Sequence, residues 1–291
     1  MKKITIIGSE SFLARNFIKY LIDNHEVELK LYDFVDHTKN GDLFYQQINF
    51  NDLENVRQID FNVDTIFFFI GKTGTTNGFD DYSAFVNVNE LILLNFLQVY
   101  REKESKARVI YPSTRLIYKS NPDEMILEHS EKELKSIYAV TKYAAEQYFQ
   151  IYKKNFGLNY VIIRICTPIG SLFDDYGNYG TFEIFENQAT KNHEVTVFGD
   201  GLQKKTFTKM EDICEAFCRL ALAESINHSQ YNLGGQALTL LDIAEKIASD
   251  YDVPVTHVPW PETSKNVDGG SVVFDSARFD EEFGMTYNNL I

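Results

Sequence analysis

The sequence predicts an α/β protein built on a doubly wound parallel sheet, with a smaller mixed α/β lobe in its C-terminal part. Apolar runs of strand length alternate with amphipathic patterns of helix length through residues 1–168. A glycine separates the first strand-like run from the first helical pattern, as in sheets that bind phosphate groups. After residue 168 the alternation ends, and the elements become short and mixed.

The first part of the pattern is strand, turn, helix and strand. The apolar run Lys3–Ile7 meets Gly8, and Phe12–Asn24 follows with apolar residues on one helical face. A second strand-like run, Glu28–Tyr32, ends at Asp33. Because parallel strands need a crossover connection such as a helix, we expect these two strands to belong to a parallel sheet.

The same alternation continues along the chain. Its further strands and helices are Thr65–Ile70, Tyr82–Tyr100, Arg108–Pro112, Ile137–Asn155 and Tyr160–Ile165. We therefore expect a sheet domain over residues 1–168, to which a helix at about 210–223 returns, and a smaller substrate lobe over 169–291. A ligand site is expected where the two parts meet.

Composition and charge exclude several classes of partner. The formal net charge is −14 and the pI about 4.9, whereas binding a nucleic-acid backbone needs a basic surface. No apolar stretch is long enough to span a bilayer, and the first residues lack a signal-peptide pattern. Since Cys166, Cys214 and Cys218 and the scattered histidines lack metal-ligand spacing, we expect a cytoplasmic protein with reduced core cysteines and no metal.

The turn after the first strand has the features of a dinucleotide site. Gly8 permits a sharp turn there. The backbone amides that open the next helix, around Ser11, Phe12 and Leu13, would face a pyrophosphate, although Ser11 adds atoms where glycine is usual. Asp33 stands where a carboxylate accepts hydrogen bonds from the adenosine ribose. Because this carboxylate repels a 2′-phosphate and no arginine follows nearby, we expect NAD rather than NADP.

A second set of residues has the chemistry of a proton shuttle. Tyr138 and Lys142 lie four residues apart in a helical pattern, so both side chains share one face and the ammonium favours the ionised phenol. Such a tyrosine is a usable acid and base. Thr114, with Ser113 beside it, follows a strand at the sheet's ligand-binding edge, where a hydroxyl can hydrogen-bond a substrate oxygen. Taken singly, these patterns also fit a surface helix and an ordinary turn.

In this order along the chain, the motifs resemble those of the extended short-chain dehydrogenase/reductases, in the branch of NAD-dependent nucleotide-sugar epimerases and dehydratases. Thr114 lies four residues before Tyr118 and precedes the Tyr138 and Lys142 pair, as in that family. The likeness covers nearly the whole chain. It implies a Rossmann-like sheet domain, bound NAD, a nucleotide-sugar substrate and a homodimer formed through the helices Tyr82–Tyr100 and Ile137–Asn155.

The resemblance also implies a role for each matching residue. The catalytic residues would be Thr114, Tyr138 and Lys142. The cofactor would be bound by Gly8, Ser11, Phe12, Leu13, Asp33, Asn49, Phe50, Gly71, Asn87, Tyr138 and Lys142. The substrate would be bound by Ser113, Thr114, Arg115, Thr167, Lys205 and Phe207. Tyr176 and Tyr179, in a glycine-rich loop, either cover the sugar or pack on their own backbone.

Departures from the family pattern narrow the expected reaction. Arg115 and Leu116 stand where dehydratases have an Asp-Glu pair, so elimination by that mechanism is not expected. Lys205 replaces an arginine that usually binds the diphosphate, which keeps the charge but loses the planar grip. We expect epimerisation through a keto intermediate. The alternatives are reduction of a 4-keto nucleotide sugar and a non-catalytic dinucleotide-binding protein on the same fold.

Overall fold

The chain divides into two compact units in the computed structural model, which describes residues 1–173 and 180–290. The first unit comprises residues 1–114, 136–164 and 214–231, and the second comprises 115–135, 165–213 and 232–291. The segment 115–135, directly after Thr114, therefore belongs to the second unit. Tyr176 and Tyr179 lie outside the described residues.

A sheet of seven strands forms the centre of the first unit, in the order β10-β6-β5-β4-β1-β2-β3. In chain order these strands are β1 (Lys2–Ile7), β2 (Val27–Asp33), β3 (Tyr45–Gln47), β4 (Thr65–Phe68), β5 (Arg108–Thr114), β6 (Tyr160–Ile165) and β10 (Gln230–Asn232). β1 pairs in parallel with β2 and β4, as do β2 with β3 and β4 with β5. The strand order reverses between β1 and β4, which is the switch point where doubly wound sheets bind ligands.

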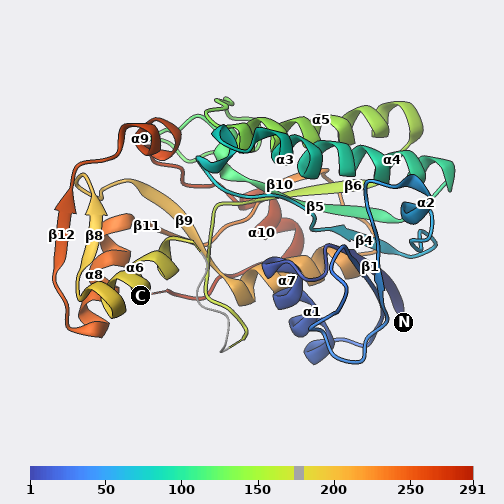
Figure 1. Ribbon diagram of the computed structural model, residues 1–291, viewed down its shortest axis with the longest axis horizontal. Coiled ribbons are helices and arrows are strands. Elements are labelled where there is room, and N and C mark those ends of the chain that lie inside the picture. Colours follow the sequence, from blue (N-terminus) through green and yellow to red (C-terminus); the bar gives the residue numbers. More distant parts are fainter. Residues whose placement is uncertain (174–179, 291) are drawn as a thin grey trace. The chain divides into compact units, whose positions relative to one another are not determined.

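Helices cover both faces of this sheet. In Figure 1, α1 (Phe12–Asn24) and α7 (Met210–Leu222) lie on one face, and α4 (Ile92–Glu102) and α5 (Ile137–Phe156) lie on the other. On the first face, the Phe17 ring centroid is 4.4 Å from that of Phe67 in β4 and 5.4 Å from that of Phe217 in α7. On the second, Phe149 of α5 packs on Tyr111 of β5 at 5.1 Å. The doubly wound α/β sheet expected from the sequence is confirmed.

One predicted helix is interrupted by a wider turn. The pattern Tyr82–Tyr100 forms α3 (Tyr82–Val86), a π-helical segment, η2 (Asn87–Leu91), and then α4. The amide of Ile92 donates to the carbonyl of Asn87, five residues back, which defines the π turn. The remaining short elements are α2 (Leu53–Val56) and the 3₁₀ turns η1 (Asn77–Phe79) and η3 (Arg115–Ile117).

The second unit contains two small sheets. β7 (Thr167–Ile169) pairs in parallel with β9 (Lys204–Lys209), which pairs antiparallel with β11 (Gln236–Thr239). β8 (Val195–Phe198) and β12 (Val255–Val258) form a parallel pair, and the helices are α6 (Thr181–Asn192), α8 (Leu240–Tyr251), α9 (Glu262–Asp268) and α10 (Ala277–Phe283). Its core is formed by Ile169, Phe185, Ala189, Val195, Val197, Phe207, Leu238, Ile243, Ala244, Ile247 and Ala248. The mixed α/β character expected of the C-terminal part is thus present.

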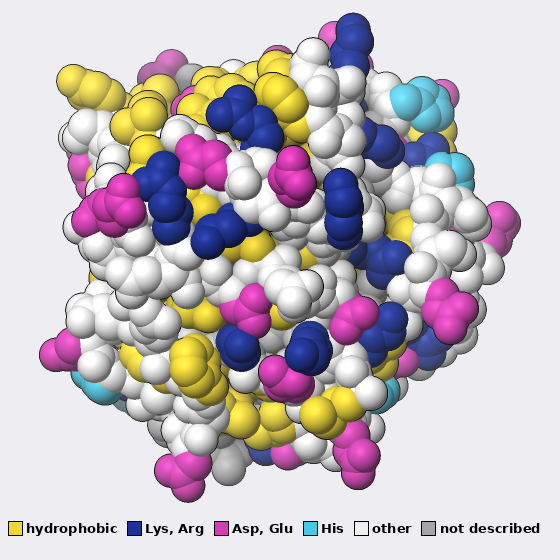
Figure 2. Space-filling view, turned by 90° about the vertical axis from the view of Figure 1, so that its right-hand side faces the viewer, with side chains coloured by type: hydrophobic (Ala, Val, Ile, Leu, Met, Phe, Trp, Pro, Cys, Tyr) yellow, Lys and Arg dark blue, Asp and Glu magenta, His cyan; other side chains and the backbone are white. Residues whose placement is uncertain are grey.

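Charged side chains of both signs are interspersed on the surface of the molecule that Figure 2 shows. No continuous basic patch is visible on that face. Within residues 1–173 and 180–290, no helix combines the length and apolar character needed to cross a membrane.

Candidate functional site

The turn between β1 and α1 requires glycine. Gly8 has φ = 82°, and a Cβ atom there would lie 2.7 Å from the backbone nitrogen of Ile70, just beyond β4. Ser11 caps α1, since its Oγ accepts a hydrogen bond from the amide of Ala14 at 3.4 Å. The serine that departs from the glycine pattern is therefore used to start the helix.

The residues around this turn fit a dinucleotide. Ser9 is fully buried, and its Oγ has no hydrogen-bond partner in the part of the chain that the structure describes. It lies beside the first turn of α1, whose amides can bind an anion. At the end of β2, Asp33 accepts hydrogen bonds from the amides of Glu10 at 2.8 Å and Phe34 at 2.7 Å. Burial raises the pKa of Asp33. An anion site and a carboxylate thus lie at neighbouring strand ends, as NAD binding requires.

Lys142 lies buried in α5, against β5. Its Nζ donates to the carbonyl oxygen of Pro112 at 2.7 Å and lies 3.8 Å from the centroid of the Tyr111 ring. The carbonyl and the aromatic face both stabilise a cation. Burial nevertheless lowers the pKa of Lys142 to about 7.

Tyr138 lies one turn before Lys142, at the start of α5. The helix begins after Ser136, whose Oγ accepts from the amide of Ala139 at 3.1 Å. The Tyr138 ring packs edge-on against Phe85, with 6.3 Å between the centroids. The positive end of the α5 dipole favours an anionic phenol at this position. The predicted proton-shuttle residue is therefore part-buried at a helix N-terminus, on the same helical face as Lys142.

The predicted hydroxyl residues end β5. Thr114, only 7% exposed, is its last residue, and Lys142 is bound to Pro112 two residues earlier. Lys142 is therefore bound near the carboxyl end of β5, the end of the strand that Thr114 forms and where ligands bind. The Oγ of Ser113 donates instead to the carboxylate of Glu146 in α5, at 2.6 Å. Glu146 in turn forms a two-pronged ion pair with Arg164 of β6, with distances of 3.0 and 2.6 Å.

In the π turn, Asn89 is the buried asparagine, whereas Asn87 is half-buried. The Asn89 side chain accepts from the amide of Lys72 at 2.7 Å, and it donates to the carbonyl of Lys72 at 3.1 Å and to the hydroxyl of Thr141 at 2.9 Å. It thus links the segment after β4 to α5, next to Lys142. A Cβ atom on Gly71 would lie 3.7 Å from the Asn89 amide oxygen and 4.0 Å from Lys142 Nζ, so Gly71 borders the same site.

The other residues expected at the cofactor make contacts that do not by themselves indicate a ligand. Asn49 is exposed, and its side-chain oxygen accepts from the amide of Asn51 at 3.2 Å. Phe50 is 2% exposed and belongs to the core of the first unit. Phe12 and Leu13 are half-buried in the first turn of α1. Their roles at the cofactor, like those of Asn87 and Asp33, stay predictions.

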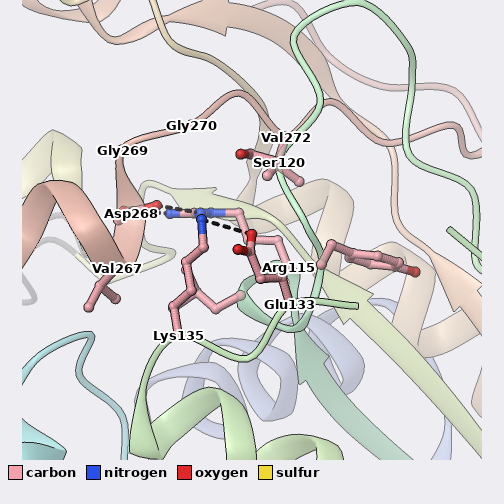
Figure 3. A pocket seen from close by; sticks show the side chains of 11 residues that line it. Arg115, Ser120, Glu133, Lys135, Val267, Asp268, Gly269, Gly270 and Val272 are labelled. Carbon is pink, nitrogen blue, oxygen red and sulfur yellow. Dashed lines mark hydrogen bonds and ion pairs between the residues drawn. The ribbon is translucent and has the colours of Figure 1, made fainter. Parts of the chain in front are cut away.

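In the second unit, two buried cations share one carboxylate. Arg115 binds Asp268 with both prongs, at 2.6 and 2.8 Å, and Lys205 Nζ lies 2.6 Å from the same carboxylate. Figure 3 shows the Arg115 and Asp268 pair in a pocket that Lys135 and Glu133 also line. Burial, and after it the charge of the neighbouring Arg115, lower the pKa of Lys205 to about 8. The two cations hold the pKa of Asp268 well below its usual range, against the effect of burial.

The other two substrate residues predicted from the sequence form part of the framework of the second unit. Thr167 of β7 is register partner to Phe207 of β9. Phe207 is fully buried in the core of this unit, and the Thr167 hydroxyl donates to the sulfur of Cys166 at 3.8 Å. Their contact with a substrate stays a prediction.

Sequence reasoning missed Glu10, Asn89, Glu146 and Asp268. Glu146 was detectable, because it follows Lys142 at the spacing that places both on one helical face. Asp268 had no local signal, since its partners Arg115 and Lys205 are far from it in the sequence. Among the described residues, no group of His, Cys, Asp and Glu side chains could hold a metal ion.

The chain is similar in sequence to two known nucleotide-sugar epimerases. A putative UDP-glucose 4-epimerase of Methanocaldococcus jannaschii is 24% identical over 219 residues, which cover 73% of this chain and 71% of that protein. CDP-paratose 2-epimerase of Salmonella typhi is 28% identical over 231 residues, which cover 70% and 68% of the two chains.

Solved structures share the fold. The Thermus thermophilus UDP-glucose 4-epimerase, whose structure is a complex with NAD, superposes with a TM-score of 0.85 at 19% identity, covering 99% of this chain and 95% of that chain. The model of the NAD dependent epimerase/dehydratase family matches residues 4–234. The chain therefore belongs to the NAD-dependent epimerase/dehydratase family.

Proposed function

We propose that this protein is an NAD-dependent epimerase of a nucleotide-diphosphate sugar, acting through a keto intermediate of the sugar. The observation that supports this most is the position of Lys142, bound to Pro112 beside Thr114 and one helical turn from Tyr138. A hydroxyl, a phenol and an amine thereby share one end of β5 and α5. Three such groups suit proton transfer to and from an alcohol.

Each group has a distinct task in this proposal. Tyr138 takes the proton from a sugar hydroxyl and later returns it, and Thr114 hydrogen-bonds the same oxygen and fixes its position. Lys142, in its protonated form, stabilises the phenolate and binds ribose hydroxyls of the cofactor. NAD, when bound, supplies the acceptor and donor of the hydride. The first turn of α1 and Asp33 would hold it.

The second unit contributes positive charge for the substrate diphosphate. Arg115 and Lys205 carry two cations against the one carboxylate of Asp268, so their cluster has an excess of positive charge when Lys205 is protonated. An anionic diphosphate fits this excess. Arg115 is engaged with Asp268 in a two-pronged ion pair, and it cannot serve as the acid of a dehydratase.

The open alternatives are a 4-keto nucleotide-sugar reductase and a non-catalytic dinucleotide-binding protein. The same three residues serve a reductase equally well, because reduction uses the second half of the epimerase reaction. A sensor, by contrast, needs no buried lysine beside a strand-end hydroxyl. The names of the relatives favour epimerisation.

Incubation with a panel of nucleotide sugars distinguishes these functions. Purified protein, NAD and UDP-, CDP-, GDP- or dTDP-sugars are mixed, and products are identified by NMR and mass spectrometry. We expect one sugar to be converted to an epimer of equal mass without net formation of NADH. Mass gain of two hydrogens from a keto sugar with NADH would indicate the reductase. Binding of NAD without conversion of any sugar would contradict the enzyme proposal.

A further inference from the structure

Glu10, in the turn between β1 and α1, ties that turn to the segment after β2. One oxygen of its carboxylate accepts from the hydroxyl of Thr38 at 2.7 Å and from the side-chain amide of Asn40 at 2.6 Å. The other oxygen accepts from the backbone amide of Lys39 at 3.1 Å. The same Asn40 amide group also donates to the carbonyl of Ser9 at 3.3 Å. We call residues 38–40 the strap.

Glu10 also fixes the carboxylate at the end of β2. Its backbone amide donates to Asp33 at 2.8 Å, so the main chain of Glu10 binds Asp33 while its side chain binds the strap. The two carboxylates interact, because the charge of Glu10 contributes to the raised pKa of Asp33, after the larger effect of burial. Burial raises the pKa of Tyr45 to about 12, and the charges of Asp33, Glu10 and Asp36 raise it in the same direction.

These contacts lie at the carboxyl ends of β1 and β2, where doubly wound sheets bind the adenosine half of a dinucleotide. A 2′-phosphate next to the ribose would add two negative charges there, close to existing carboxylates. Lys39 is the one basic residue of the strap, and its side chain is exposed. Most of the charge near this turn is therefore negative. Hydrogen bonds to the backbone and to the strap hold the carboxylates of Asp33 and Glu10 in place.

We propose that Glu10 is a specificity-determining residue for the cofactor. By binding the strap and adding its charge to that of Asp33, it makes the protein bind NAD and exclude NADP. This inference rests on the proposed function, since it assumes that a nicotinamide dinucleotide binds at this turn. Discrimination between NAD and NADP then depends on Glu10, in the turn between β1 and α1, as well as on Asp33 at the end of β2.

Glu10→Gln removes the negative charge of the side chain and keeps its size and shape, so it tests the contribution of the charge. A glutamine can still accept from Thr38 and Asn40 through its carbonyl, but it places an NH₂ group opposite the amide of Lys39. Glu26→Gln is the matched control, because Glu26 is exposed and precedes β2, at the opposite end of that strand from Asp33. It removes one charge from the protein without changing the turn. Lys39→Ala tests whether the exposed lysine binds a phosphate instead.

Binding of NAD and NADP to each cofactor-free protein is measured by calorimetry. We expect the wild type to prefer NAD, and Glu10→Gln to raise the ratio of NADP to NAD affinity about tenfold, the effect of one charge pair at an intermediate dielectric. Glu26→Gln and Lys39→Ala should not raise this ratio. An unchanged ratio in Glu10→Gln, an equal rise in Glu26→Gln, or a wild type that prefers NADP would overturn the inference.

Hydrogen exchange of the cofactor-free protein gives a second readout. The amide of Lys39 donates to Glu10, so Glu10→Gln should speed exchange at Lys39 while exchange in β6 stays as in the wild type. Unchanged exchange at Lys39 would contradict the proposal that the Glu10 carboxylate holds the strap. If the wild type binds neither dinucleotide, the proposed function fails as well. If it binds NAD and the Glu10 variant behaves as the wild type, only the present inference fails.

Discussion

Tyr138 is the side chain on which the proposed chemistry depends. Tyr138→Phe removes the proton-transferring oxygen and keeps the ring that packs on Phe85. We expect the rate of sugar conversion to fall about 10²–10⁴-fold, with NAD affinity changed little, because general acid and base catalysis is worth that much. Steady-state kinetics and calorimetry measure the two quantities. Tyr152→Phe, the same change further along α5, should leave both intact, and retained turnover in Tyr138→Phe would refute the assignment.

The lowered pKa of Lys142 predicts that the stability of the protein depends on pH. Its pKa is about 7 in the folded protein and near 10.5 when unfolded, so the unfolded state binds more protons between these values. The free energy of unfolding should therefore rise with pH in this window, by at most about 1.4 kcal/mol per pH unit for this group.

Lys142→Met should remove this part of the pH dependence. Urea unfolding of the cofactor-free protein at pH 7, 8 and 9 measures the slope. Lys154→Met, which removes an exposed lysine of the same helix, should keep the wild-type slope. Equal slopes for the wild type and Lys142→Met would show that Lys142 is protonated equally in both states.

The sequence predicted which residues lie near one another better than it predicted their state of protonation. The spacing of Tyr138 and Lys142 was informative because helix geometry alone places them on one face. The protonation of Lys142 was not predictable, since it follows from burial against Tyr111 and Pro112, which only the fold brings there. Asp268 escaped detection for the same reason: its partners come from distant parts of the chain.

Elements were predicted best where local signals mark their ends. α1 begins at the Ser11 cap and has the limits expected from the sequence, and α5 ends at Gly157, whose φ is 71°. β4 is shorter than the predicted Thr65–Ile70, since pairing with β1 and β5 ends before the apolar run does. The π turn in Asn87–Leu91 was not predicted, because the hydrophobic spacing of that region also fits an α-helix.

Removal of the ion pair that joins α5 to β6 should cause a large loss of stability. Glu146 is fully buried and Arg164 is 1% exposed, and their ion pair also binds Ser113 of β5. Glu146→Ala leaves the guanidinium buried without its carboxylate, so we expect a loss of about 3–5 kcal/mol in the free energy of unfolding. Denaturant titration measures it.

A surface ion pair provides the comparison. Asp23→Ala removes the partner of Lys19 on α1, and we expect a change within about 1 kcal/mol. A similarly small effect of Glu146→Ala would show that the buried pair adds little beyond the packing around it.

At the scale of the whole molecule, the helical layer over α3 to α5 exposes apolar side chains. Leu91 is 51% exposed and Val140 43%, and Ile151 of α5 is 52% exposed. Covering such residues from water favours association. We therefore predict a homodimer formed through this layer.

Light scattering measures the mass of the particle. Leu91→Asp should shift it from that of a dimer to that of a monomer, because a charge in an apolar interface is costly. Ile22→Asp is the control, since Ile22 is 46% exposed on α1, which covers the other face of the sheet. A monomeric wild type would contradict the prediction.

The wide turn at Asn87–Leu91 shows where this chain can vary in length. A π turn takes up one extra residue in a single widened turn, so the helical segments before and after it keep the same faces toward the sheet. Removal of one residue here would restore regular winding and leave Leu93, Phe96 and Leu97 packed in the core. Homologues that lack this residue should therefore carry one apolar stripe of unbroken helical spacing, whereas in this chain the stripe shifts by one residue at the turn.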